Sequence, residues 1–471
     1  MTAYEPPPGS IPTLPVPDLA GLRRTHLVGI GGAGMSGIAT LLMARGVQVT
    51  GSDLKDGVEV ERVRSQGAVV SIGHDAGNVG EADAVVISTA IRRENPEVRE
   101  ADARSIPVYL RAQVLASLLR QHARTVAVAG THGKTTTTSM LAHILERAGL
   151  DPTYVIGGDL NESGSNARSG GGDIAIAEAD ESDGSFLLLS PEVAIITNVD
   201  ADHLDFYGSQ AQVDAAFVEF AAQARHVIAC GDDPGVRRIL PETSTAVTTY
   251  GIEPGADIRV DVVGVAAGGS EGAISLNDQE LKVTVSLPGS HHVLNAAAAI
   301  AAAARMGLAP ATAAEALRSF AGVRRRFDLR GTARGATFVD DYAHHPAEIR
   351  ATLEAAGADG AQRVVAVFQP HRYSRTAVAG RELGASLAAA DVIVLTEVYA
   401  AGELAIPGVS ARLVLEGVLE AAPGKRVVFL PRRSDLASFL AREVRPGDLV
   451  LTLGAGDVTT VADETIARMS A

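Results

Sequence analysis

Short apolar runs alternate with longer segments of helical periodicity in three stretches of the chain. The first stretch opens at Arg24 with a strand pattern, a glycine turn, an apolar helix and a second strand that ends at Asp53. The second contains the apolar run Thr125–Ala129 and the helical pattern Ser139–Leu150, and the third repeats this alternation after residue 335. Strands that alternate with helices indicate parallel sheets. We therefore predict an α/β fold of three domains, with Rossmann-like first and last domains.

The proposed boundaries follow a proline-rich start, a connector at residues 120–124 and the basic run near residue 325. A proline-rich start predicts a flexible lead-in over residues 1–20, followed by domains over 21–120, 121–325 and 326–471. A polar stretch with short β patterns, residues 250–288, predicts hairpins at the edge of the second domain.

The second domain begins with TVAVAGTHGKTTTT, which is typical of a strand, a phosphate loop and a helix start. Gly130 and Gly133 allow amide groups to face an anion, Lys134 supplies charge, and Thr135 supplies a hydroxyl for Mg²⁺. The usual spacing requires glycine at position 128, where Val128 stands, so a glycine turn with a solvated lysine remains an alternative. We expect Lys134 to be exposed and to contribute little to packing. The motif predicts a central domain of the P-loop ATPase type.

Acidic side chains follow two later strands of this domain. Glu178, Asp180, Glu181 and Asp183 come after the apolar run DIAIA, which predicts a cation such as the Mg²⁺ of an ATP site, although Glu181 and Asp183 also fit a solvated loop. His203 stands between acids in NVDADHLD, where we predict contact with metal or phosphate. Ligands of open α/β sheets bind at the carboxyl ends of strands, where both segments lie.

The first domain carries a G-x-G-x-x-G pattern at Gly29, Gly31 and Gly34, with Asp53 at the end of the next strand. This pattern predicts a nucleotide diphosphate on a helix N-terminus. The spacing does not distinguish NAD from another diphosphate nucleotide, and close helix packing is a further alternative.

The third region begins with a basic run, Arg324 to Arg326, and then places polar residues after successive apolar strands. These residues predict a shared cleft: Asp340, Asp341, Tyr342, His344, His345, His371, Arg372, Arg375, Glu397 and Tyr399.

Composition narrows the classes of function. The 471 residues carry a formal charge of −15, which argues against a nucleic-acid binder because phosphate neutralisation requires a basic face. No stretch resembles a secretory signal or a membrane span, and the single Cys230 fits a reducing cytoplasm. We expect a cytoplasmic protein without membrane or nucleic-acid partners that is a monomer or a weak homodimer.

Seven segments in order resemble the Mur ligases over almost the whole chain: GIGGAGMSGIA, AGTHGKTTTT, EADESDGSF, TNVDADHLD, DDYAHHPAE, FQPHRYSRT and GAGD. The resemblance implies an ATP-dependent ligase that joins L-alanine to the lactyl carboxylate of UDP-N-acetylmuramate through an acyl phosphate, with Mg²⁺, in peptidoglycan synthesis. It implies that the first glycine turn holds UDP and not NAD.

The resemblance also implies roles for individual residues. The UDP-sugar would be bound by Gly31, Gly32, Gly34, Met35, Ser36 and Asp53. ATP would be bound by Gly130, Thr131, His132, Gly133, Lys134, Thr135, Thr136, Asn295, Arg326 and Asp341. The metal would be supported by Thr135, Glu178 and His203, and the amino acid by Tyr342, His344, Arg372 and Arg375. Catalysis would depend on Lys134, Glu178, His203, His344, Arg372 and Arg375.

Two positions depart from the family pattern. His292 stands where an asparagine is expected, which affects the predicted adenine contacts. Residues 204–224 contain no lysine, so the carbamylated lysine of several sister ligases has no counterpart there, and metal support is expected from carboxylate and imidazole groups alone.

Two other functions fit parts of the sequence. The first glycine motif with Asp53 also fits a nicotinamide-dependent oxidoreductase, which would bind NAD(H) and not UDP-sugars. A nucleotide-regulated binding protein would bind ATP without releasing phosphate.

Overall fold

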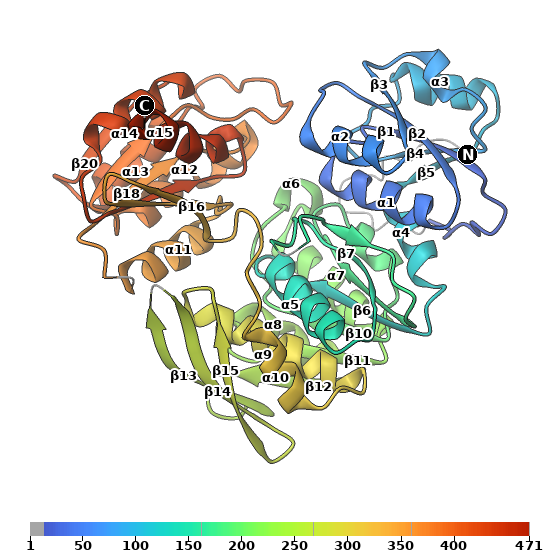
Figure 1. Ribbon diagram of the computed structural model, residues 1–471, viewed down its shortest axis with the longest axis horizontal. Coiled ribbons are helices and arrows are strands. Elements are labelled where there is room, and N and C mark those ends of the chain that lie inside the picture. Colours follow the sequence, from blue (N-terminus) through green and yellow to red (C-terminus); the bar gives the residue numbers. More distant parts are fainter. Residues whose placement is uncertain (1–13, 162, 267, 359, 471) are drawn as a thin grey trace. The chain divides into compact units, whose positions relative to one another are not determined.

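The computed structural model describes residues 14–161, 163–266, 268–358 and 360–470, so most of the predicted lead-in lies outside the described residues. Three sheets with flanking helices confirm the predicted α/β class (Figure 1). The chain divides into two compact units. The larger extends to Asp261 and includes Ala273–Val283 and Leu294–Phe320; the smaller contains Val262–Gly272, Thr284–Val293 and the residues from Ala321 onward.

The first sheet has the order β3-β2-β1-β4-β5, and all of its strands are parallel. This order matches a Rossmann half, as predicted. Alternate residues of β1 point to opposite faces, so Leu27 joins the core under α1 and α4, while Val28 joins a second cluster with α3. The elements are β1 (Arg24–Val28), α1 (Ala33–Ala44), β2 (Gln48–Asp53), α2 (Val58–Ser65), β3 (Val69–Ile72), η1 (Ala76–Val79), β4 (Ala84–Ile87), α3 (Pro96–Ala103), β5 (Val108–Leu110) and α4 (Arg111–Leu119).

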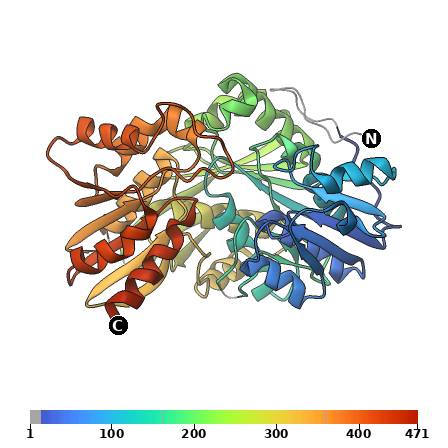
Figure 2. The same ribbon diagram turned by 90° about the horizontal axis from the view of Figure 1, so that it is seen from above.

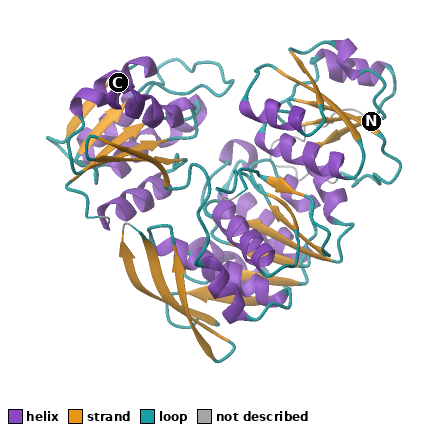
Figure 3. Cartoon of the chain, viewed as in Figure 1, coloured by secondary structure: helices purple, strands orange, loops and turns teal. Residues whose placement is uncertain are grey.

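The central sheet has the order β15-β14-β13-β12-β11-β10-β6-β9-β7-β8. Strand β6 lies between β10 and β9 and is parallel to both. Strands β13, β14 and β15 follow one another along the chain and are neighbours in the sheet, as expected for the predicted hairpins (Figure 3). The strands are β6 (Arg124–Ala129), β7 (Thr153–Val155), β8 (Ala167–Arg168), β9 (Ile174–Glu178), β10 (Val193–Ile196), β11 (His226–Cys230), β12 (Ala246–Gly251), β13 (Ile258–Ala266), β14 (Gly269–Leu276) and β15 (Gln279–Val285).

The helices around the central sheet include α5, which begins at Lys134, five residues earlier than its apolar pattern indicates. None of the helices within the described residues has the length and apolar character needed to cross a lipid bilayer. The helical elements are α5 (Lys134–Arg147), η2 (Ser185–Leu188), α6 (Leu204–Tyr207), α7 (Gln210–Gln223), α8 (Pro234–Ile239), η3 (Leu240–Glu242), α9 (Ser290–Arg305) and α10 (Pro310–Leu317).

The third sheet has the order β16-β17-β21-β18-β19-β20, and only β16 is antiparallel to its neighbour. The last strand, β21, therefore lies between β17 and β18. Helices α11, α12 and α13 share a core with one face, and α14 and α15 with the other (Figure 2). The elements are β16 (Asp328–Ala333), β17 (Ala336–Asp341), α11 (Pro346–Ala358), β18 (Arg363–Phe368), α12 (Tyr373–Leu387), β19 (Val392–Leu395), α13 (Arg412–Ala421), β20 (Arg426–Phe429), η4 (Arg433–Asp435), α14 (Leu436–Glu443), β21 (Asp448–Leu453), η5 (Asp457–Thr460) and α15 (Val461–Ser470).

Helices α12 and α13 approach each other closely because glycine stands at their crossing. A Cβ atom on Gly384 would lie 2.6 Å from the backbone nitrogen of Val418, and one on Gly417 would lie 2.6 Å from the Cα of Arg381. Both obstacles are backbone atoms, which cannot swing aside. The two glycines therefore set the distance between the helices.

We expect Gly384→Ala to lower the free energy of unfolding by about 2 kcal/mol, since overpacking costs about 1–3 kcal/mol. The matched control is Gly357→Ala in α11, where a Cβ meets nothing within 4 Å. There the higher helix propensity of alanine should raise stability by about 1 kcal/mol or less. Urea unfolding of the three proteins measures both effects. Equal stability of the two variants would contradict the proposed crossing.

Candidate active site

The glycine turn after β6 is held against the end of β10. Gly130 has φ +136°, and a Cβ there would collide with Thr197 Oγ1 and lie 3.1 Å from the backbone nitrogen of Asn198. Gly133, the N-cap of α5, has φ +79°. Both positions therefore favour glycine, and the turn leads directly into the N-terminus of a 14-residue helix. This is the geometry of a phosphate loop.

Lys134 is held inside this loop. Its Nζ donates to the carbonyl of Gly130 at 2.6 Å and lies 2.8 Å from Oε2 of Glu181. The side chain of Lys134 is 13% exposed and that of Glu181 is 3% exposed. The expectation of an exposed lysine is therefore wrong, and Glu181 is not part of a solvated loop. A pair this deeply buried fixes the direction of the lysine.

Carboxylates surround the lysine and set its charge. Burial alone would lower the pKa of Lys134, but the negative charges of Glu181, Asp180 and Glu178 outweigh burial and raise it. Burial would raise the pKa of Asp180, but Lys134 and Arg111 lower it. Lys134 therefore carries its positive charge at neutral pH, beside an ionised Asp180.

Thr135 and Glu178, two of the predicted metal-supporting residues, are in contact. The Thr135 hydroxyl donates to Oε1 of Glu178 at 3.0 Å, and Oε2 of Glu178 accepts from the backbone of Gly157 at 2.6 Å. A hydroxyl and a carboxylate at the start of a phosphate-binding helix provide oxygen ligands, which Mg²⁺ prefers. These two residues therefore fit a magnesium ion that accompanies a nucleotide.

The segment after β10 is hydrogen-bonded to the phosphate loop. The backbone nitrogen of His132 donates to Asn198 Oδ1 at 2.8 Å, and that of Asp200 donates to Thr131 Oγ1 at 2.9 Å. His203 has φ +56° at the N-cap of α6, and its Nε2 lies 3.8 Å from Oε1 of Glu181. The predicted His203 thus faces the carboxylate that holds Lys134.

Asn295, predicted to meet adenine, lies against the phosphate loop. A Cβ on Gly133 would stand 3.0 Å from Asn295 Oδ1, and the side chain of Thr136 is buried in α5. The larger unit therefore brings Asn295 together with the residues from Gly130 to Thr136.

The glycine turn of the first sheet is closed by Asp53. Its Oδ2 accepts the backbone N–H of Gly31 at 2.9 Å. Gly32 is the N-cap of α1 and Gly34 lies in its first turn. The side chain of Met35 packs in the core, and the Ser36 hydroxyl donates to Glu59 at 3.1 Å. The side chains of Met35 and Ser36 thus point into the protein, so their predicted ligand contacts stay predictions.

A buried carboxylate organises the edge of this sheet beside Asp53. Glu97 is fully buried and accepts from Ser52 Oγ at 2.7 Å and from Asn78 Nδ2 at 2.7 Å, and its Oε2 lies 3.0 Å from His74 Nδ1. Burial alone would raise the pKa of Glu97, but His26, Asn78 and Ser52 lower it to about 2. Glu97 therefore stays ionised and fixes Ser52 and His74. Sequence reasoning missed it, since its partners lie on β1, β2 and the segment after β3.

The smaller unit gathers the residues predicted for the amino acid. The His344 ring meets those of Tyr342 and His371, with centroids 5.1 and 6.0 Å away, and His371 stacks on Tyr399 at 5.7 Å. Arg372 caps α12 with φ +67°, and its N–H donates to the carbonyl of Tyr399 at 2.8 Å. Tyr342, His344 and Arg372 thus border one cluster of rings.

Both histidines of this cluster are neutral. Burial lowers the pKa of His344 to about 3 and that of His371 to about 4, and the positive charge of Arg375 lowers both further. A general base works best with a pKa near the operating pH. The low pKa of His344 therefore favours hydrogen bonding over proton abstraction by this residue.

Arg326 and Asp341, predicted to bind ATP, lie in the same unit. The guanidinium of Arg326 is 5.1 Å from the centroid of the Tyr342 ring. Asp341 is buried and accepts from the backbone of Phe327 at 2.7 Å and of Ala343 at 2.8 Å. Burial raises the pKa of Asp341 to about 6. These contacts fix the chain on either side of β16 and β17.

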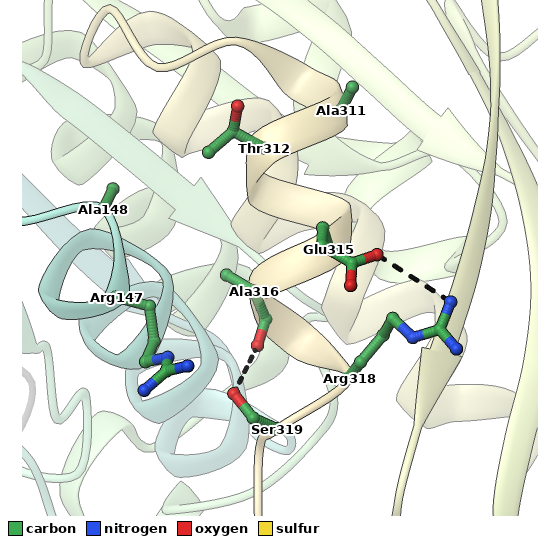
Figure 4. Close-up of a pocket in the computed structure, with 8 residues that line it drawn as sticks. All are labelled: Arg147, Ala148, Ala311, Thr312, Glu315, Ala316, Arg318 and Ser319. Carbon is green, nitrogen blue, oxygen red and sulfur yellow. Dashed lines mark hydrogen bonds and ion pairs between the residues drawn. The ribbon is translucent and has the colours of Figure 1, made fainter.

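A separate surface pocket lies between the C-terminus of α5 and α10 (Figure 4). Its wall includes Glu315 and Arg318, which form an ion pair. It also includes Ser319, whose hydroxyl donates to the Ala316 carbonyl. None of the predicted site residues lines this pocket.

Family models match three consecutive regions of the chain. Residues 24–123 match the Mur ligase family, catalytic domain; residues 128–303 match the Mur ligase middle domain; and residues 325–456 match the Mur ligase, glutamate ligase domain.

Curated relatives and solved structures are similar over nearly the whole chain. UDP-N-acetylmuramate–L-alanine ligases from Desulforamulus reducens and Rubrobacter xylanophilus are 46% and 47% identical, covering 95% of this chain and 98% and 100% of those proteins. The crystal structure of UDP-N-acetylmuramate–alanine ligase from Thermotoga maritima has a TM-score of 0.82 at 29% identity, covering 95% of this chain and 99% of that one. A murein peptide ligase from Psychrobacter arcticus gives 0.72 at 26% identity, with coverage of 95% and 99%.

We expect Lys134→Ala to abolish nucleotide-dependent turnover and also to lower the free energy of unfolding by about 3 kcal/mol, because it leaves the Glu181 carboxylate buried without its partner. The double variant Lys134→Ala/Glu181→Gln removes that unpaired charge. It should recover at least half of the lost stability and remain inactive. Urea unfolding and ADP release measure the two effects, and a Lys134→Ala protein as stable as the wild type would contradict the buried pair.

We expect Glu97→Gln to destabilise the protein by about 3 kcal/mol at pH 7, since a pKa lowered from 4.5 to about 2 contributes about 1.4 kcal/mol per unit. Because the folded pKa is depressed, this stability is present above pH 4.5 and is lost as the pH falls towards 2. The difference from wild type in urea unfolding should therefore shrink below pH 4.5. Glu100→Gln on the same helix, whose ion pair with Arg104 is on the surface, is the control. A pH-independent difference would refute the assignment.

Proposed function

The chain belongs to the Mur ligase family, and from that premise we propose that it joins L-alanine to the lactyl carboxylate of UDP-N-acetylmuramate. The reaction consumes ATP, releases ADP and phosphate, and contributes to peptidoglycan synthesis. Support comes from relatives named UDP-N-acetylmuramate–L-alanine ligase, which match 95% of the chain at 46–47% identity. The nicotinamide-dependent oxidoreductase is not supported, since all three family models describe ligase domains.

One observation carries the proposed chemistry. At the start of α5, Lys134 forms an ion pair with Glu181, and the Thr135 hydroxyl donates a hydrogen bond to Glu178. The lysine charge would neutralise the γ-phosphate of ATP while the substrate carboxylate attacks it, which forms an acyl phosphate and releases ADP. The amine of the amino acid then adds to the acyl carbon and expels phosphate.

Mg²⁺ bound with ATP would offset charge on the transferred phosphoryl group. Thr135 and Glu178 are the residues of this chain that we propose to support it, with His203 as a neighbour of the site through Glu181. Residues 204–224 carry no lysine, which is consistent with support by carboxylate and hydroxyl groups.

The other assignments are proposals of the same kind. Gly31, Gly32, Gly34, Met35, Ser36 and Asp53 are proposed for the UDP-sugar, with amides at the N-terminus of α1 facing the diphosphate. Asn295, Arg326 and Asp341 are proposed for ATP. Tyr342, His344, Arg372 and Arg375 are proposed for the amino acid, whose carboxylate suits a guanidinium.

The division into three domains at residues 120/121 and 325/326 remains a proposal, as does a monomer or weak homodimer. We also propose a cytoplasmic site of action, because ATP and UDP-sugars are cytoplasmic metabolites.

We expect ADP release to require UDP-N-acetylmuramate and an amino acid together. L-Alanine should exceed glycine in kcat/KM by about 10-fold or more, since a buried methyl group is worth about 1–3 kcal/mol of discrimination. L-Serine is the second competitor. A coupled ADP assay measures all three, with UDP-N-acetylglucosamine, which lacks the carboxylate, as the control. ADP release that no amino acid stimulates would refute the ligase.

A further inference from the structure

Arg111 occupies a position between the two nucleotide loops of the larger unit. It is the first residue of α4 and directly follows β5, at the carboxyl edge of the first sheet. Helix α4 contacts α1, η2 and β9. The glycine turn lies at the start of α1, and the acidic segment around Asp180 lies between β9 and η2. Helix α4 therefore contacts the elements that carry both loops.

The guanidinium of Arg111 lies against the first turn of α1. A Cβ atom on Gly34 would stand 3.0 Å from both Cδ and Cζ of Arg111. The arginine side chain thus occupies the space that a side chain at position 34 would fill. Gly34 is not among the glycines of positive φ, so a side chain there would have to displace the Arg111 guanidinium but would not strain the backbone.

The first turns of the two helices beside Arg111 provide no carboxylate for its guanidinium. The N-terminus of a helix carries about half a positive charge, and a cation there costs about 0.3–1 kcal/mol. Neither α1 nor α4 has an acidic residue in its first turn. Asp180 is near enough for Arg111 to stabilise its charge, but it already faces Lys134. Among residues 14–161, 163–266, 268–358 and 360–470, no hydrogen bond or ion pair of the guanidinium is seen.

We propose that Arg111 binds the lactyl carboxylate of the sugar nucleotide and holds it between the glycine turn of α1 and Lys134. This inference rests on the proposed function. The diphosphate is an alternative anion for the same guanidinium. The carboxylate is favoured because the charges of Arg111 and Lys134 both act on Asp180, so the guanidinium lies near the segment that holds the lysine, which the attacking oxygen must approach. Backbone amides are available to the diphosphate.

The charge of Arg111 would also act during the reaction. The carboxylate loses its charge when it becomes an acyl phosphate, and the added phosphoryl group brings new negative charge to the same place. A guanidinium can donate to both groups in turn without releasing a proton. Arg111 is thus a substrate-contacting residue that the motif comparison did not indicate.

The test compares two sugar nucleotides that differ by the lactyl group. Isothermal titration gives the Kd of UDP-N-acetylmuramate and of UDP-N-acetylglucosamine for the wild type, Arg111→Ala and Arg111→Lys. We expect Arg111→Ala to weaken UDP-N-acetylmuramate at least tenfold, about the value of one charged hydrogen bond, and to leave UDP-N-acetylglucosamine within about twofold. The Kd of Arg111→Lys for UDP-N-acetylmuramate should lie between those of the wild type and Arg111→Ala. In turnover, the KM for ATP should stay within about twofold.

The matched control is Arg120→Ala, at the exposed C-terminal end of the same helix, which should match the wild type in every measurement. Equal weakening of both sugar nucleotides would assign Arg111 to the diphosphate and overturn the proposal. No weakening of either would also overturn it. If Arg111→Ala does not fold, Arg111→Lys carries the comparison. A wild type that fails to bind UDP-N-acetylmuramate would instead refute the proposed function.

Discussion

The place of β6 between β9 and β10 determines where the chemistry of the larger unit occurs. The three strands are parallel, so the loops that follow them leave the sheet at the same edge. The phosphate loop follows β6, the acidic segment follows β9, and the segment with Asp200 follows β10. Residues almost 50 positions apart, Lys134 and Glu181, consequently form one buried ion pair.

The surroundings of this ion pair carry an excess of carboxylates. One lysine faces Glu178, Asp180 and Glu181, so the carboxylates exceed the ammonium group in number. Such an excess is expensive to bury unless other cations complete it. The guanidinium of Arg111 already acts on Asp180, and the Mg²⁺ that we propose to accompany ATP would add a further cation. The acidic residues thus support the proposal that the nucleotide binds together with a metal ion.

Much of the fold could be predicted from the sequence because parallel strands and amphipathic helices have different periods. The glycine turns at Gly31 and Gly130 were predictable because their neighbours are a strand and a helix start. The insertion of β21 between β17 and β18 was not, since strand order depends on pairing between distant segments. The burial of Glu181 was not predictable either, because its partner Lys134 lies on another strand end, and the sequence shows only an acidic segment.

In the candidate site, too, some contacts could be predicted from the sequence and others could not. Contacts within one motif, such as that of Gly31 with Asp53, agree with the spacing of the residues. Contacts between motifs required the structure. Glu97 is an example, because its surroundings combine His26 of β1, Ser52 of β2 and Asn78 of η1.

The neutral imidazoles of His344 and His371 have a consequence for the amino acid that we propose to bind in the smaller unit. An amino acid arrives as a zwitterion, and its ammonium group would be repelled by any protonated histidine beside it. With pKa values of about 3 and 4, these rings present uncharged nitrogen atoms across the physiological range. Positive charge in the cluster is then confined to guanidinium groups such as that of Arg375, which attract the opposite end of the zwitterion. In the proposed function, the cluster would therefore fix the direction of the zwitterion, with its carboxylate towards the guanidinium groups, before the amide bond forms.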